Sequence, residues 1–82
     1  GVRAYLSSSQ GSPILYINSE FSSHIQVQVY SALGQSLLED VYPLRDGENE
    51  IGLPQLGSYP TGVYYLTLQK GRERRMLKWI KN

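Results

Sequence analysis

The clearest pattern in this sequence is an alternation of apolar and polar side chains, which restricts much of the chain to extended strands. In residues 24–30 the apolar Ile25, Val27 and Val29 alternate with polar glutamines. Successive side chains of a strand point to opposite faces, so this pattern is typical of an antiparallel strand with one face in a core and the other in water. Residues 48–53 and 63–69 alternate in the same way, and we expect these inward sets: Asn49, Ile51 and Leu53, then Tyr64, Leu66 and Leu68.

Weaker strand patterns and regular turn signals cover the rest of the chain. The best candidate for a helix, residues 31–40, contains Gly34 and is too short to be stable alone. Seven short strands predict an all-β fold, an immunoglobulin-like or fibronectin-like antiparallel β-sandwich of about seven strands. We expect a single domain over residues 1–82, a fragment of a longer secreted protein. The weaker strands are residues 2–6, 14–18, 37–42 and 74–81, and the turns are residues 7–12, 18–23, 33–35, 45–47, 54–62 and 70–71.

Residues 56–64 predict a tyrosine corner, a structural motif of immunoglobulin-like sandwiches. A leucine and a turn containing proline and glycine precede Tyr64, which opens an alternating strand. In a tyrosine corner the phenol bonds back to backbone a few residues upstream and fixes the crossover between the sheets. We therefore expect Tyr64 to be structural.

Size and composition exclude several kinds of chemistry. The chain has 82 residues and no cysteine, so disulfides, cysteine-bound zinc, iron–sulfur clusters and cysteine nucleophiles are excluded. No apolar run approaches the ~18–20 residues that a membrane-spanning helix needs. The single histidine, His24, stands beside Ser22 and Ser23, but the chain has no Gly-x-Ser-x-Gly motif. We expect no enzyme activity, no catalytic residue and no cofactor, and we predict that His24 is exposed at a strand end.

A cluster of carboxylates in residues 39–50 invites a calcium-binding interpretation. Asp46-Gly47-Glu48-Asn49-Glu50 supplies oxygen ligands. The glycine is misplaced for the twelve-residue EF-hand loop, and no bidentate glutamate closes it. The alternative is a hairpin with Asp46-Gly47 as its turn and a solvated acidic edge. We predict the hairpin and no metal site.

Positive charge is concentrated at the carboxyl end. Residues 70–82 hold six cationic side chains and one acidic side chain and carry +5, whereas residues 1–69 carry −4. The cations and Trp79 could contact nucleic acid, but the rest of the chain is acidic, and a basic last strand also protects a sheet edge from aggregation. We expect neither nucleic acid nor a membrane span.

A series of short motifs runs from about Ile14 to the last residue. In order they are Leu15-x-Ile17, Val27-x-Val29-Tyr30, Gly34-Gln35, Gly47-x-Asn49-x-Ile51-x-Leu53-Pro54-x-Leu56, Pro60-x-Gly62-Val63-Tyr64-Tyr65-Leu66, Gly71 and Lys78-Trp79-Ile80-Lys81. Their order, spacing and position at a carboxyl terminus resemble the C-terminal sorting domain of the type IX (Por) secretion system of gram-negative bacteria. One departure is the opening: members usually begin with a Tyr-Pro-Asn-Pro-like stretch, and residues 5–13 contain no Asn-Pro.

The resemblance implies that the domain is a sorting signal for an upstream cargo domain. It would fold in the periplasm, be captured by the outer-membrane translocon and bring the cargo to the outer-membrane surface or into the medium. In typical members a sortase-like peptidase removes the domain and joins the cargo to surface lipopolysaccharide. The departure at residues 5–13 leaves open whether this domain is removed or is retained uncleaved as a docking module.

The cationic and aromatic tip of the last strand is the expected recognition end. A terminal strand with free backbone groups can be recognised by strand addition and by charge. We expect the translocon and sortase-like components to contact Lys78, Trp79, Ile80 and Lys81. The alternative is that Trp79 or Ile80 packs in the core while the lysines solvate the edge. The motif residues expected to serve the fold are Gly34, Gly47, Asn49, Gly62 and Tyr64.

A rival function is a generic immunoglobulin-like accessory or adhesion module of a secreted protein. It would share the sandwich and the tyrosine corner but would not depend on the last five residues. In either case, exposed strand edges in so small a domain allow pairing into a dimer.

Overall fold

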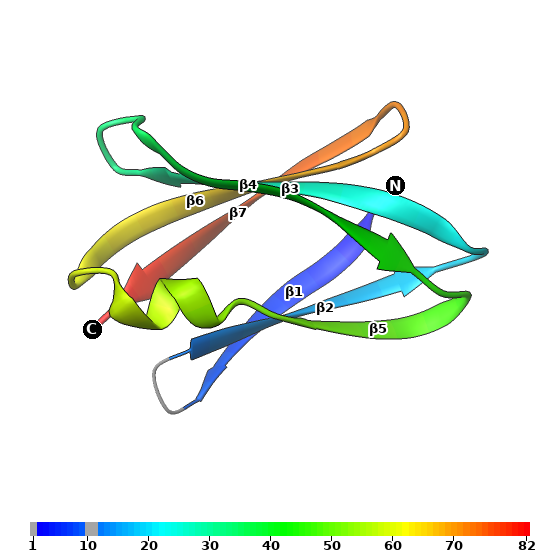
Figure 1. Cartoon of the computed structure of the whole chain (residues 1–82), viewed down its shortest axis with the longest axis horizontal. Coiled ribbons are helices and arrows are strands. Elements are labelled where there is room, and N and C mark those ends of the chain that lie inside the picture. The colour runs from blue at the N-terminus through cyan, green and yellow to red at the C-terminus, as the bar shows by residue number, and fades with distance from the viewer. Residues whose placement is uncertain (1, 10–11) are drawn as a thin grey trace.

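In the described part of the chain, seven antiparallel strands form two sheets that face each other across a shared core (Figure 1). The computed structural model describes residues 2–9 and 12–82. In chain order the elements are β1 (Arg3–Ser9), β2 (Ser12–Ser19), β3 (Ser23–Ser31), β4 (Ser36–Leu44), β5 (Gly47–Gly52), the 3-10 helix η1 (Pro54–Ser58), β6 (Gly62–Lys70) and β7 (Glu73–Lys81). One sheet has the order β1-β2-β5 and the other β4-β3-β6-β7. The predicted seven-stranded sandwich is confirmed.

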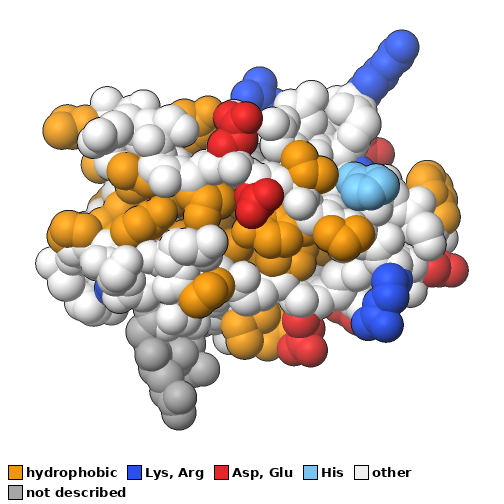
Figure 2. Space-filling view, viewed as in Figure 1, with side chains coloured by type: hydrophobic (Ala, Val, Ile, Leu, Met, Phe, Trp, Pro, Cys, Tyr) orange, Lys and Arg blue, Asp and Glu red, His pale blue; other side chains and the backbone are white. Residues whose placement is uncertain are grey.

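The inner faces of the two sheets supply the core, as the alternation predicts. Ile25, Val27 and Val29 of β3 are each 0% exposed. The inward sets predicted in β5 and β6 and at Leu53 are also buried. Figure 2 shows apolar side chains in the band between the two sheets on the side that faces the viewer. The partly buried side chains that pack against the core are Leu6, Leu37, Leu38, Tyr42, Tyr59 and Leu77.

The predicted turns at residues 7–12 and 54–62 contain regular structure that the sequence did not indicate. In residues 7–12, β1 continues to Ser9 and β2 begins at Ser12, while residues 10 and 11 lie outside the described residues. Pairing with a neighbouring strand extends these serines despite their preference for turns. In residues 54–62 the chain forms η1, which begins with a proline and buries Leu56. Proline suits this position because the first turn of a helix has no partner for its N–H.

The predicted hairpin at Asp46-Gly47 is wrong. Strand β4 pairs with β3 whereas β5 pairs with β2, so the chain crosses from one sheet to the other between them. The side chain of Asn49 closes this corner. Its amide nitrogen donates to the carbonyls of Arg45 (2.9 Å), Gly47 (3.1 Å) and Ile17 (3.3 Å), and its oxygen accepts from the Arg45 N–H (2.9 Å). Gly47 has φ +99°, a conformation that glycine adopts without steric cost.

Candidate recognition strand at the carboxyl end

Strand β7 lies at the edge of the four-stranded sheet. It pairs with β6 from Lys70↔Glu73 to Gly62↔Lys81, and no other described strand pairs with it. Such an edge has a row of backbone N–H and C=O groups that a further strand can bond. The sequence therefore located correctly both the last strand and its cationic side chains.

Alternation divides the predicted recognition residues between two faces of β7. Trp79 points into the core and is 5% exposed, and its ring centroid lies 5.4 Å from that of Tyr64. Its indole nitrogen is buried without a hydrogen-bond partner among the described residues. Lys78 and Ile80 are exposed, Ile80 at 56%. Of the adjacent residues 78–80, the strand thus turns only the lysine and the isoleucine outward.

Lys81 turns inward and holds the end of the chain against η1. Its ammonium donates to the carbonyls of Leu56 (3.2 Å), Gly57 (2.5 Å) and Tyr59 (2.6 Å). The Leu56 carbonyl also accepts from the Tyr59 N–H at 3.3 Å, so the cation adds a second bond there and binds the carbonyls of Gly57 and Tyr59 as well. Figure 1 shows the carboxyl terminus beside this helix. The Lys81 ammonium is therefore already bonded within the fold.

The tyrosine corner fixes the same loop from the other side. The Tyr64 hydroxyl donates to the Pro60 carbonyl, which confirms the predicted corner. The Tyr59 ring lies 5.6 Å from the Tyr64 ring, and its hydroxyl donates to the Leu37 carbonyl at 3.5 Å. Burial, with a smaller effect from Tyr64, raises the pKa of Tyr59 above 10.0. The start of β6 and the end of β7 therefore converge on one loop.

The outward side chains of β6 and β7 form a continuous surface, here named the β6–β7 face. Lys78 lies opposite Tyr65 and Ile80 opposite Val63, while Met76 is 62% exposed. A hollow of about 370 Å³ opens on this face and is lined in part by Tyr65 and Met76. Tyr65 and Met76 were not among the residues predicted to be recognised, although counting back in twos along the strand from Lys78 leads to Met76. The outward residues of the face are Val63, Tyr65, Thr67, Gln69, Arg74, Met76, Lys78 and Ile80.

The sequence model of the secretion-system C-terminal sorting domain matches residues 12–82, which is most of the chain. The chain belongs to this family of sorting domains. A comparison with curated proteins finds no match. Membership of this family supports a function as a C-terminal sorting signal of the type IX secretion system. Such a signal directs export to the cell surface or secretion.

The cations at the carboxyl end of this sorting domain fall into two groups. Three are held by contacts within the protein: Lys70 lies 5.0 Å from the Phe21 ring centroid, Arg75 donates to the Val2 carbonyl at 3.0 Å, and Lys81 binds the η1 carbonyls. Arg72, Arg74 and Lys78 are exposed and have no hydrogen bond or ion pair with the described residues. These three carry positive charge that no contact with the described residues occupies.

The remaining candidates from the sequence are His24 and the carboxylates of residues 39–50. His24 is exposed at the start of β3, as predicted, opposite Pro43. Within residues 2–9 and 12–82, no three His, Asp or Glu side chains gather closely enough to hold a metal ion. The described part of the chain also has no helix long and apolar enough to cross a membrane.

Proposed function

We propose that this sorting domain carries an upstream cargo domain from the periplasm through the outer-membrane translocon and is recognised at the carboxyl end of β7. The observation that carries the proposal is the outward pair Lys78 and Ile80, a cation and an exposed apolar side chain on an edge strand next to the end of the chain. A partner can meet this pair by adding a strand, by charge and by covering the isoleucine.

The four residues of the recognition end have two different roles in this proposal. Lys78 and Ile80 contact the translocon and the sortase-like components. Trp79 and Lys81 present them, because the buried ring and the bonded ammonium hold β7 in place. A partner that recognises the folded end would meet a rigid strand and lose little conformational entropy on binding.

The experiment is a fusion of residues 1–82 to a periplasmic reporter in a host that has the secretion system. The test variant is Lys78→Ser with Ile80→Ser. The matched control is Arg74→Ser with Met76→Ser, which removes the same kinds of side chain from the same face of the same strand. Circular dichroism melting of each purified variant shows that both fold.

We expect surface display of the parent and of the control, and at least a tenfold loss of display for the test variant. Equal display of test and control would refute recognition at the end of β7. No display of the folded parent would refute the sorting function and favour an accessory or adhesion module. The mass of the exported product shows whether the domain is removed or is retained as a docking module.

A further inference from the structure

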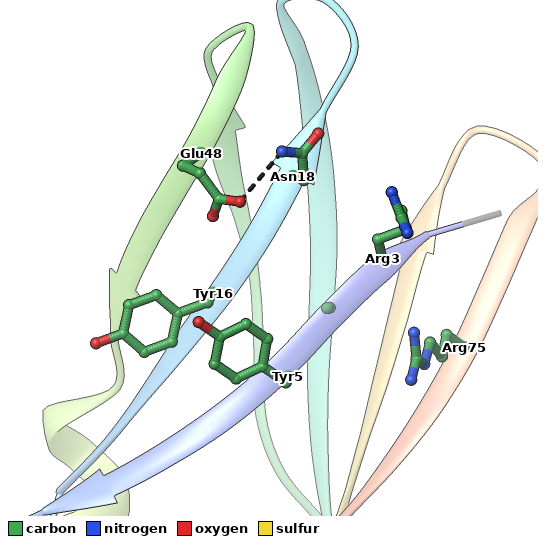
Figure 3. A pocket seen from close by; sticks show the side chains of 7 residues that line it. Arg3, Tyr5, Tyr16, Asn18, Glu48 and Arg75 are labelled. Carbon is green, nitrogen blue, oxygen red and sulfur yellow. Dashed lines mark hydrogen bonds between the residues drawn. The ribbon is translucent and has the colours of Figure 1, made fainter.

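The outer face of the three-stranded sheet has a hollow that the proposed recognition of β7 does not use (Figure 3). Its volume is about 340 Å³, within the usual range of small-molecule sites. Side chains from β1, β2, β5 and β7 line it, so it depends on the folded sandwich. The lining residues are Arg3, Ala4, Tyr5, Tyr16, Asn18, Glu48 and Arg75.

Two stacked tyrosines form an aromatic wall of the hollow. Tyr5 of β1 lies directly opposite Tyr16 of β2, and their rings stack with centroids 4.9 Å apart and planes 13° apart. Tyr5 is nevertheless 59% exposed, because it lies on the outer face of β1, and within residues 2–9 and 12–82 no further strand pairs beyond β1. Stacking restrains a ring that would otherwise be mobile, so this surface is preorganised for a flat, partly apolar ligand.

Charge is distributed unequally around the tyrosines. Arg3 lies on the same face of β1, two residues or about 7 Å along the strand from Tyr5. It has no hydrogen bond or ion pair with the described residues, while Arg75 bonds a backbone carbonyl from beside the edge of β1. On the other side, Asn18 donates to Glu48 at 3.1 Å. The hollow thus offers cations on one side and a mixed donor and acceptor pair on the other.

We propose that this hollow binds a sugar that bears a carboxylate, such as a uronic acid residue of a polysaccharide. The tyrosine rings pack against the apolar face of the pyranose. Arg3 and Arg75 bind the carboxylate, which suits the planar fork of a guanidinium. Asn18 and Glu48 bond the ring hydroxyls, which both donate and accept.

The acidic side chains of β5 favour this ligand over a polyanion. Glu48 lies opposite Asn18, and Glu50 lies opposite Tyr16 on the same face. A run of phosphates or glutamates would place negative charge against these carboxylates as well as against the arginines. A ligand with one carboxylate at one end and hydroxyls at the other meets both sides of the hollow.

The test is a nitrogen-15 NMR titration of the 82-residue chain with a galacturonic acid dimer, and separately with a neutral galactose dimer. We expect saturable shifts at residues 3–5, 16–18 and 48, with the acidic dimer bound more tightly. Arg3→Gln should weaken the acidic dimer about tenfold and leave the neutral dimer nearly unchanged, since a hydrogen bond to a charged group is lost. Tyr5→Ala should weaken both.

The control is Arg74→Gln, which removes an exposed arginine from the β6–β7 face and should leave both affinities unchanged. The spectrum of each variant before titration is compared with that of the parent, so that a variant that fails to fold is recognised. Absence of saturable shifts, or equal affinity in Arg3→Gln and the parent, would overturn the proposal. Tighter binding of a tetraglutamate peptide than of the acidic dimer would overturn the assignment to a sugar.

Discussion

Replacing Lys81 with methionine tests whether its ammonium holds the carboxyl end of the domain. The substitution keeps most of the apolar stem and removes three hydrogen bonds, to the carbonyls of Leu56, Gly57 and Tyr59. A hydrogen bond to a charged group contributes about 1.5–3 kcal/mol, but an exposed acceptor regains a bond to water when it is lost. The Gly57 bond is exposed and the other two are partly buried. We therefore expect a net loss of about 2–3 kcal/mol.

Urea unfolding, followed by the fluorescence of the single tryptophan, measures this loss. Trp79 is buried two residues before Lys81, so its emission reports on the same end of the molecule. With a urea dependence of about 1 kcal/mol per molar for so small a chain, the unfolding midpoint should fall by about 2–3 M.

Lys78→Met is the matched control, because Lys78 lies on the same strand, is exposed and has no hydrogen bond or ion pair with the described residues. Its free energy of unfolding should stay within about 0.5 kcal/mol of the parent. Equal losses in Lys81→Met and Lys78→Met would refute the reasoning, because the positive charge alone would then explain the effect.

Three further predictions concern the two corners and two partly buried phenols. Tyr64→Phe should lower the free energy of unfolding by about 1 kcal/mol or somewhat more in urea, because the bond to the Pro60 carbonyl is lost; an unchanged midpoint would argue against the corner. Asn49→Ala should cost about 2–4 kcal/mol, since it leaves backbone groups of the β4–β5 corner without partners, and a loss under 0.5 kcal/mol would contradict this role. Burial raises the pKa of Tyr42 and of Tyr59 above 10.0 in the folded state, with smaller effects from neighbouring groups. Because the folded protein favours the neutral form of these two phenols, the stabilisation from them is fully present below pH 10 and is lost as pH rises through their folded-state pKa values. A melting temperature that stays constant from pH 9 to pH 12 would contradict this prediction.

Much of the fold could be predicted because strand alternation is local. The inward sets of β3, β5 and β6 follow from side-chain period alone, and the structure buries all three. The tyrosine corner could also be predicted, since Tyr64 and Pro60 are four residues apart. In each case the residues that carry the signal are neighbours in the chain.

Predictions that depended on distant partners were less successful. Asp46-Gly47 has the composition of a hairpin turn, but whether two strands form a hairpin depends on which strands pair. Asn49 reaches Ile17, a residue 32 positions away, and β5 pairs with β2 across that separation. Local residue preferences carry no information on such a pairing, because its free energy comes from burial of both strands in the assembled sheet.

The sequence by itself determined that the chain is an all-β sandwich with a tyrosine corner, a basic last strand and the motif series of a sorting domain. Only the tertiary structure decided how the recognition end is divided. Trp79 packs on Tyr64, and Lys81 binds carbonyls 22 to 25 residues earlier, while Lys78 and Ile80 stay outside. The physical reason is that a strand has two faces, and only the fold decides which face meets the core and which backbone groups lie within reach of a side chain.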